Sequence, residues 1–244
     1  MTPSMTLPVK RFYSTREAPC PYISDQLERK VFTELDGDER DPVYMHEALT
    51  AAGFRRSHSI AYKPICKNCS ACIPVRIRVA EFAPTRSMRR VLIANQHLIA
   101  DEQPAFASSN QYEIFSKYVS SRHGESGMAD MNFADYIAMV EESPIETSIV
   151  EYRDNTGVLV GAALIDYLED GLSMVYSFFD PACTRQSLGT FMILWQIAAA
   201  VERGLDYVYL GYWIQNSPKM SYKIRFQPIE GLITNQWAPI LSDG

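Results

Sequence analysis

The order of apolar and polar positions changes near Pro144, and the part of the chain after it has the pattern of a sheet. Three stretches rich in β-branched and aromatic residues cover positions 145–152, 158–167 and 172–180. The segments between them, Asp154-Asn155-Thr156-Gly157 and Glu169-Asp170-Gly171, consist of turn formers. This pattern predicts three strands joined by tight turns, an antiparallel meander.

Residues 187–203 are apolar on nearly every side, which predicts a helix buried in the core and ended by Gly204. After it we expect a strand over residues 207–213, a short helix over 219–225 and a last strand over 232–237 that closes the sheet. A meander, a buried helix that begins at a glycine-containing turn and a further strand form the core of the GNAT type of acyltransferase fold. The predicted fold class is therefore α+β, a GNAT-like core with an N-terminal cysteine-containing α+β region packed on it.

The first part of the chain mixes short strands and helices. Strands are predicted over residues 28–35, 54–62 and 73–79, with a turn at 36–38. Asp41 and Thr85 are predicted to cap two helices, which end at Gly53 and Asn95. Two more helices are predicted over residues 109–123 and 132–141. We place a boundary between an N-terminal cysteine-containing region, 1–104, and a GNAT-like domain, 105–244.

The composition and the N-terminus indicate a globular protein of the cytoplasm. With 47% hydrophobic and 21% charged residues, the chain is not of the disordered class. No apolar stretch is long enough to cross a bilayer, and the first residues, MTPSMTLPVKRFYS, lack the apolar core of a signal peptide. We therefore expect a cytoplasmic protein with reduced cysteines.

Four of the five cysteines lie in the first third of the chain. Prolines flank the first of them on both sides, and Pro64 and Pro74 enclose a triplet spaced three apart, which keeps both segments out of regular helix. Such a set predicts a metal site: an iron–sulfur cluster fits it better than zinc, which more often uses two separate Cys-x-x-Cys pairs. Four reduced thiols that pack a loop are the alternative. The predicted ligands are Cys20, Cys66, Cys69 and Cys72.

The charge of the chain is distributed unevenly. The net charge is −6, yet residues 53–90 carry nine basic side chains and one acidic side chain, Glu81. A local field of one sign attracts a polyanion even to an acidic protein, so this segment predicts a contact with a phosphate backbone. The alternative is an ordinary solvated face. The arginines predicted to make this contact are Arg55, Arg56, Arg76, Arg78, Arg86, Arg89 and Arg90.

The turn before the buried helix bears on the acyl donor. GNAT acetyltransferases carry a [Gln/Arg]-x-x-Gly-x-[Gly/Ala] loop whose backbone amides hold the pyrophosphate of acetyl-CoA. Gln186 and Gly189 match the first half of this loop, whereas Phe191 stands at the position of the small residue. We expect the phenylalanine to obstruct a pyrophosphate, which disfavours a conventional acetyl-CoA transferase.

Both halves of the chain contain short, distinctive motifs. The first half has CPY at 20–22, GFRRS at 53–57 and the run YKPICKNCSACIPVR at 62–76. The second half has YSFFDP at 176–181, SLG at 187–189 and YLGYWI at 209–214, followed by KMSYK at 219–223. In this order they resemble the aminoacyl-tRNA–protein transferase family over nearly the whole chain. The length and cysteine pattern resemble its compact bacterial branch, the aspartate/glutamate leucyltransferases, although Ile23 stands where eukaryotic relatives have the second cysteine of a pair.

The resemblance implies an enzyme that moves leucine from leucyl-tRNA to the N-terminal Asp or Glu of an acceptor protein and so marks it for degradation by the N-end rule pathway. The acceptor amine attacks an activated ester, so alignment supplies most of the acceleration, and no cofactor or nucleophilic triad is required. We therefore assign no catalytic residue. In one alternative arginine is the donor, with Asp166, Asp180 or Asp206 in its pocket. In the other the chain is a non-enzymatic, metal-dependent RNA-binding or redox-sensing module.

The substrate residues are predicted mainly between positions 207 and 225. Lys219 and Lys223 are four apart, hence on one face of the predicted helix, and are expected to bind the acceptor carboxylate. Aromatic side chains offer surface for a leucine pocket or for stacking on the terminal adenine of tRNA, although some belong to the core. These aromatic residues are Tyr209, Tyr212, Trp213 and Tyr222.

Overall fold

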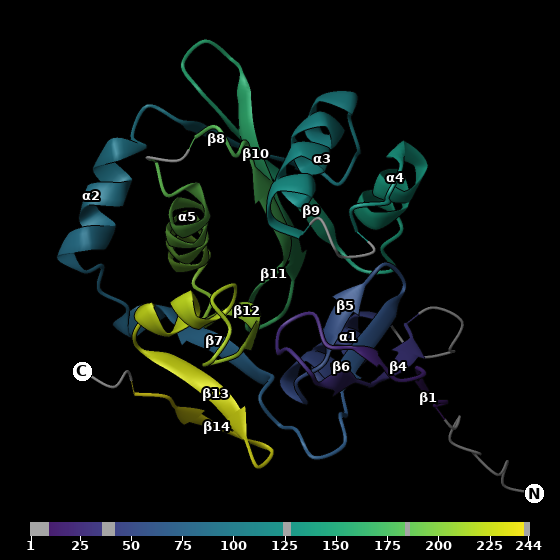
Figure 1. The fold of residues 1–244 in the computed structure, drawn as a ribbon. Coiled ribbons are helices and arrows are strands. Elements are labelled where there is room, and N and C mark those ends of the chain that lie inside the picture. Colours follow the sequence, from purple (N-terminus) through teal and green to yellow (C-terminus); the bar gives the residue numbers. More distant parts are fainter. Residues whose placement is uncertain (1–9, 36–41, 124–127, 184–185, 242–244) are drawn as a thin grey trace, which may run out of the picture.

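The computed structural model describes residues 10–35, 42–123, 128–183 and 186–241, and Figure 1 shows its ribbon. Within these residues the main element is an eight-stranded sheet in the order β14-β13-β7-β12-β11-β10-β9-β8. Its strands are β7 (Ile73–Arg78), β8 (Ile99–Pro104), β9 (Thr147–Arg153), β10 (Leu159–Tyr167), β11 (Gly171–Phe179), β12 (Tyr207–Trp213), β13 (Ile229–Ile233) and β14 (Gln236–Pro239).

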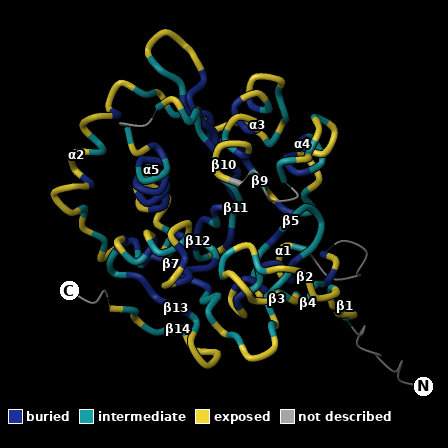
Figure 2. Tube along the Cα trace, in the orientation of Figure 1, coloured by how far each residue is buried: buried dark blue, intermediate teal, exposed yellow. Residues whose placement is uncertain are grey.

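The predicted GNAT-like core is confirmed. Strands β9, β10 and β11 form an antiparallel meander, α5 (Leu188–Glu202) follows, and β12 then pairs with β11 in parallel. Most of α5 is buried, as the dark blue colour of this helix shows in Figure 2. The apolar residues around the whole circumference of α5 are therefore core residues, and the fold class is α+β.

Helices cover both faces of the large sheet. Helices α5 and α2 (Arg86–Ala94) pack on one face, where Met88 and Phe191 join the larger apolar cluster. Helices α3 (Ser109–His123) and α4 (Phe133–Glu141) pack on the other, around Phe115 and Phe178. Figure 1 shows these two layers on either side of the strands. None of the described helices has the length and apolarity needed to span a bilayer.

A second, smaller sheet lies beside β11 and β12 at the lower right of Figure 1. It joins β1 (Tyr13–Ser14), β4 (Lys30–Glu34), β6 (Ile60–Pro64) and β5 (Arg55–Ser57), and α1 (Pro42–Ala51) packs next to it. A separate pair is formed by β2 (Ala18–Pro19) and β3 (Leu27–Glu28). Strands β7 and β8 lie within residues 1–104 and yet belong to the large sheet, so this sheet spans the predicted boundary. The division into two domains stays a prediction.

Some predicted elements differ from the structure. The single strand over 54–62 is a hairpin, β5 and β6, because His58 adopts a left-handed backbone with φ of 54°. The last strand over 232–237 is also a hairpin, β13 and β14, turning at Thr234 and Asn235, both with positive φ. The turn at 36–38 and the cap Asp41 lie outside the described residues.

The predicted helix over 219–225 is a shorter 3₁₀ helix, η2 (Ser221–Arg225); a second one, η1 (Val79–Glu81), follows β7. Lys219 is exposed and precedes η2, whereas Lys223 within it is buried. The expectation that these lysines share one helix face is therefore wrong, because the helix starts too late and its pitch of three residues per turn separates positions four apart.

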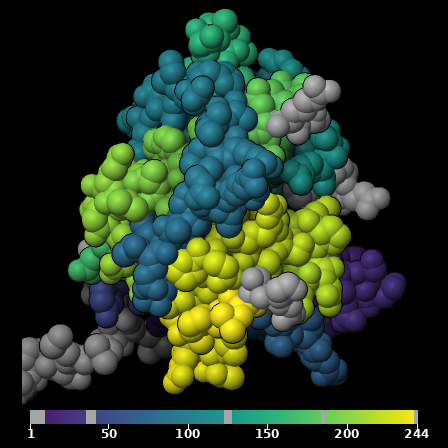
Figure 3. Space-filling view, turned by 90° about the vertical axis from the view of Figure 1, so that its left-hand side faces the viewer, coloured from purple at the N-terminus to yellow at the C-terminus, as the bar shows by residue number. Residues whose placement is uncertain are grey.

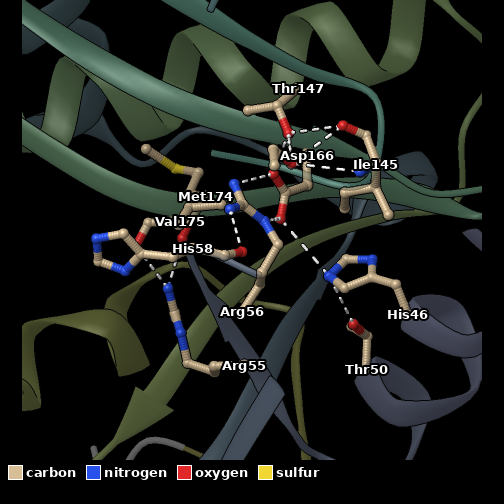
Figure 4. Close-up of polar contacts among 11 residues, drawn as sticks. His46, Thr50, Arg55, Arg56, His58, Ile145, Thr147, Asp166, Met174 and Val175 are labelled. Carbon is tan, nitrogen blue, oxygen red and sulfur yellow. Dashed lines mark hydrogen bonds and ion pairs between the residues drawn. The ribbon is translucent and has the colours of Figure 1, made fainter. Parts of the chain in front are cut away.

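A buried ion pair fastens the small sheet to the large one. Arg56 of β5 donates from Nε and Nη2 to the two carboxylate oxygens of Asp166 in β10, both at 2.7 Å (Figure 4). Thr147 donates to the same carboxylate at 2.9 Å, and His46 of α1 lies 3.5 Å from it. Burial lowers the pKa of His46 and so favours its neutral ring. The carboxylate is thus fully partnered.

We expect Asp166→Ala to destabilise the fold by about 3–5 kcal/mol, because it leaves the guanidinium of Arg56 buried without its partner. Chemical denaturation measures this loss. The matched control is Glu113→Gln, which breaks an exposed ion pair with Lys117 and should leave the denaturation midpoint unchanged. A loss below about 1 kcal/mol for Asp166→Ala would show that the pair does not fasten the two sheets.

Candidate active site

The large sheet opens where β11 and β12 part. These parallel strands pair only from Gly171–Ser173 to Tyr207–Tyr209, although both run further. Each strand also bulges near this point, β11 at Val175 and β12 at Leu210, where one residue has no register partner on the neighbouring strand. Bulges are frequent beside active sites. Carbonyl groups on both sides of the opening therefore need donors other than the sheet.

Arg55 supplies the donors on the β11 side. Its Nη2 donates to the carbonyl oxygens of Met174 and Val175, both at 2.8 Å (Figure 4). The guanidinium passes directly over Gly211 of β12, which has φ of 72°, and a methyl group built at that position would overlap it. A small cavity beside it is lined in part by Phe54 and Tyr209. Glycine at 211 thus lets the arginine enter the opening.

Lys223 supplies the donors on the β12 side. Its Nζ donates to the carbonyl oxygens of Leu210 at 2.8 Å and Tyr212 at 2.6 Å. The residue is only 6% exposed. Burial, and then the nearby charge of Arg55, lower the pKa of Lys223 well below its usual value. Two basic side chains thus replace the backbone hydrogen bonds that β11 and β12 no longer make with each other.

Tyrosines surround this pair of basic groups. Tyr212 donates to the carbonyl oxygen of Gly53 at 3.0 Å, and its ring centroid is 6.4 Å from that of Tyr62. Burial raises the pKa of Tyr22 to about 12 and that of Tyr222 to about 12, so these phenols stay protonated. Arg55 interacts electrostatically with Tyr22, Tyr212 and Tyr222. Tyr176 of β11 and Tyr118 of α3 belong to the same group of tyrosines and interact with each other.

The four predicted metal ligands lie near one another at the border of the opening. Burial, and then Cys20, Cys66 and Cys69, raise the pKa of Cys72 to about 12. Cys72 in turn interacts electrostatically with Tyr212 and Lys223. Within the described part of the chain, however, no three His, Cys, Asp or Glu side chains are arranged to hold a metal ion. The predicted iron–sulfur cluster or zinc ion is therefore without support from the arrangement of the described thiols.

The predicted phosphate-binding arginines fall into separate places. Arg55 lies in the opening and Arg56 in the buried ion pair. Arg76 stacks between Tyr207 and Trp237 and pairs with Glu230 at 2.9 Å. Arg78 pairs with Glu81. The remaining three are exposed on α2, which runs within the blue segment across the face shown in Figure 3: Arg86, Arg89 and Arg90.

Only some of the predicted substrate-binding residues lie at the opening. Tyr212, Tyr222 and Lys223 come together at the opening, whereas Trp213 is buried and donates from Nε1 to Ser221 at 3.3 Å. Tyr209 points toward Asp170, to which it donates at 2.8 Å. Sequence reasoning missed Tyr22, Tyr62, Tyr118 and Tyr176 as a group. Tyr22, Tyr62 and Tyr176 lie in the quoted motifs, which was the signal that could have found them.

Phe191, expected to obstruct a pyrophosphate, instead packs into the core. It is 7% exposed and lies edge-on to Tyr152 of β9, at 5.8 Å between ring centroids. Its side chain faces the sheet, so it is explained by core packing.

Known proteins match nearly the whole chain. The family model for the N terminus of arginine-tRNA-protein transferase matches residues 18–90, and the model for its C terminus matches residues 110–233. An aspartate/glutamate leucyltransferase of Paramagnetospirillum magneticum is 54% identical over 94% of this chain and 95% of its own. The protein of that name from Rhizobium meliloti is 51% identical over 96% of this chain and 93% of its own length. Among solved structures, L-PGS from Bacillus licheniformis matches with a TM-score of 0.48 at 12% identity, over 59% of this chain and 46% of that chain.

Two family models that together cover most of the chain, and relatives more than half identical over nearly full length, agree on one assignment. The chain belongs to the aminoacyl-tRNA–protein transferase family, in its aspartate/glutamate leucyltransferase branch.

Proposed function

We propose that the protein transfers the leucyl group of leucyl-tRNA to the N-terminal Asp or Glu of acceptor proteins, at the opening between β11 and β12. The observation that carries this proposal is the pair of basic side chains, Arg55 and Lys223, held between bulged strands and surrounded by tyrosines. Relatives that bear the name aspartate/glutamate leucyltransferase support the same reaction. Such transfer would mark the acceptor for degradation by the N-end rule pathway.

The reaction exchanges an ester for an amide. The acceptor α-amine, with a reference pKa of about 8, is partly neutral at neutral pH and attacks the carbonyl carbon of the leucyl ester. The bond to the ribose oxygen breaks, and the proton of the amine ends on that oxygen. The protein aligns amine and ester and surrounds them with fixed donors, so the transfer needs no cofactor.

Arg55 is the residue we assign to the acceptor carboxylate. Both of its hydrogen bonds use Nη2, which leaves Nη1 and Nε without a hydrogen-bond partner among the described residues. A guanidinium fork of this kind suits a carboxylate. Lys223 is already bonded to two carbonyls, and it supports the opening rather than binding the acceptor.

The donor side favours leucine over arginine. A cationic side chain requires a carboxylate in its pocket, and buried Asp166 is already held by Arg56 and Thr147. The charged side chains described at the opening, Arg55 and Lys223, are basic and tyrosines lie around them, which suits an apolar leucyl group better than a second cation.

The exposed arginines of α2 are proposed to contact phosphates of the tRNA. Arg86, Arg89 and Arg90 lie on the surface without a carboxylate partner among the described residues. Exposed cations of this kind add affinity that does not depend on sequence.

The donor assay tests the function directly. The protein is incubated with a peptide that begins with Asp or Glu and with labelled leucyl-tRNA, arginyl-tRNA or acetyl-CoA. We expect the label to reach the peptide from leucyl-tRNA only. Transfer from arginyl-tRNA would replace leucine by arginine in the proposal, and no transfer from any donor would favour a non-enzymatic RNA-binding or redox-sensing module.

We expect Arg55→Gln to lower kcat/KM for an Asp-initiated peptide on the order of 100-fold, because the charged partner of the carboxylate is lost. The activity with an Ala-initiated peptide should change little, so the preference for Asp over Ala collapses. Lys219→Gln is the matched control, since Lys219 is exposed and is one of the two lysines that the sequence predicted to bind the acceptor. If Lys219→Gln abolishes the preference and Arg55→Gln preserves it, the assignment of Arg55 is wrong.

Replacing Arg86, Arg89 and Arg90 by Gln should weaken tRNA binding. The slope of log K against log salt should fall by about 0.7–0.9 for each phosphate that the protein no longer neutralises. The control replaces the same three residues by Lys, which keeps their charges and should keep most of the slope. Equal affinity and slope for the Gln variant and the wild type would show that these arginines of α2 do not contact the tRNA.

A further inference from the structure

The hydroxyl of Tyr176 is buried at the opening and has no partner among the described residues. Tyr176 follows the bulged Val175 in β11, and its ring lies edge-on to Phe115 of α3, at 5.9 Å between centroids. Its hydroxyl oxygen is shielded from solvent and makes no hydrogen bond to any of these residues. Most buried hydroxyls are hydrogen-bonded, so an unpaired one beside a substrate site indicates a donor reserved for a ligand.

The surroundings of this hydroxyl define the ligand atom it suits. Burial, and then Tyr118 and Tyr22, raise the pKa of Tyr176, so the phenol is protonated and available as a donor. Among the described groups, no carboxylate influences the pKa of this phenol. Arg55 donates a hydrogen bond to the carbonyl oxygen of the preceding residue, Val175. An oxygen that gains negative charge fits this place better than an ammonium group.

We propose that Tyr176 is a catalytic residue that donates a hydrogen bond to the carbonyl oxygen of the aminoacyl ester as this oxygen becomes an oxyanion. This assignment rests on the proposed function. The amine nitrogen forms a bond to the carbonyl carbon, and the π electron pair of the carbonyl moves onto the oxygen that Tyr176 faces. When the double bond re-forms, the bond to the ribose oxygen breaks, and the amine proton passes to that oxygen.

Tyr176→Phe removes the hydroxyl and nothing else. Since the hydrogen bond is strongest to the oxyanion, we expect kcat to fall by about 10²-fold. The KM values for leucyl-tRNA and for the acceptor peptide should stay within about threefold. The denaturation midpoint should not fall, because the hydroxyl has no partner among the described residues of the folded protein.

Tyr152→Phe is the matched control. Tyr152 also has a buried hydroxyl, which interacts with Gln196 of α5, and it lies in the core between β9 and α5, against Phe191 and Trp195. Tyr152→Phe should show wild-type kcat and lose no more than about 1 kcal/mol of stability. The pair of variants therefore separates a catalytic hydroxyl from one that is merely buried.

Three outcomes overturn the assignment: wild-type kcat for Tyr176→Phe, a change confined to KM, or an equal loss of kcat in Tyr152→Phe. All three presuppose that the wild-type protein transfers leucine. If the wild type transfers none, the proposed function fails first, and the assignment of Tyr176 fails with it.

Discussion

The parting of β11 and β12 creates a demand for hydrogen-bond donors that the rest of the structure meets. Carbonyl groups of Met174 and Val175 on one strand, and of Leu210 and Tyr212 on the other, have basic side chains as partners. A buried carbonyl without a partner costs about 1–3 kcal/mol, so these partners stabilise the opening. One constraint thus both keeps the strands apart and concentrates basic groups where they part.

The donors come from different parts of the chain, which explains why the small sheet is fixed so firmly. Lys223 belongs to the segment after β12, but Arg55 reaches the opening from β5 of the small sheet. Its neighbour in sequence, Arg56, points the other way and is locked to Asp166. Since adjacent residues of a strand point to opposite sides, this lock also sets the position of Arg55. The GFRRS motif therefore combines an anchor and a site residue.

Local patterns predicted the elements of the fold well, and the contacts between distant elements poorly. The turns at 154–157 and 169–171 and the apolar run of α5 were sufficient for the GNAT-like core, because each is encoded within a short window. The bulges at Val175 and Leu210 depend on the register between strands far apart in sequence. No local signal marks them, so the opening could not be located from the sequence.

The candidate site shows the same limit at the level of single residues. The charge count of residues 53–90 treated Arg55, Arg56 and Arg76 as alike, yet one lines the opening, one is in a buried ion pair and one stacks between aromatic rings. Lys223 was expected to bind the acceptor carboxylate and is instead buried, hydrogen-bonded to two carbonyl groups of the opening. Tertiary pairing decides whether a cation is available to a ligand.

Burial therefore has opposite consequences for the charged and the neutral groups of this site. A basic group taken out of water without partners is costly, so half-buried Arg55 and buried Lys223 both use the carbonyls of the parted strands. A neutral phenol costs far less to bury unpaired, so Tyr176 can keep an unused donor in the folded state. The phenol of Tyr176 can thus keep an unsatisfied donor for the moment when charge develops on a substrate oxygen.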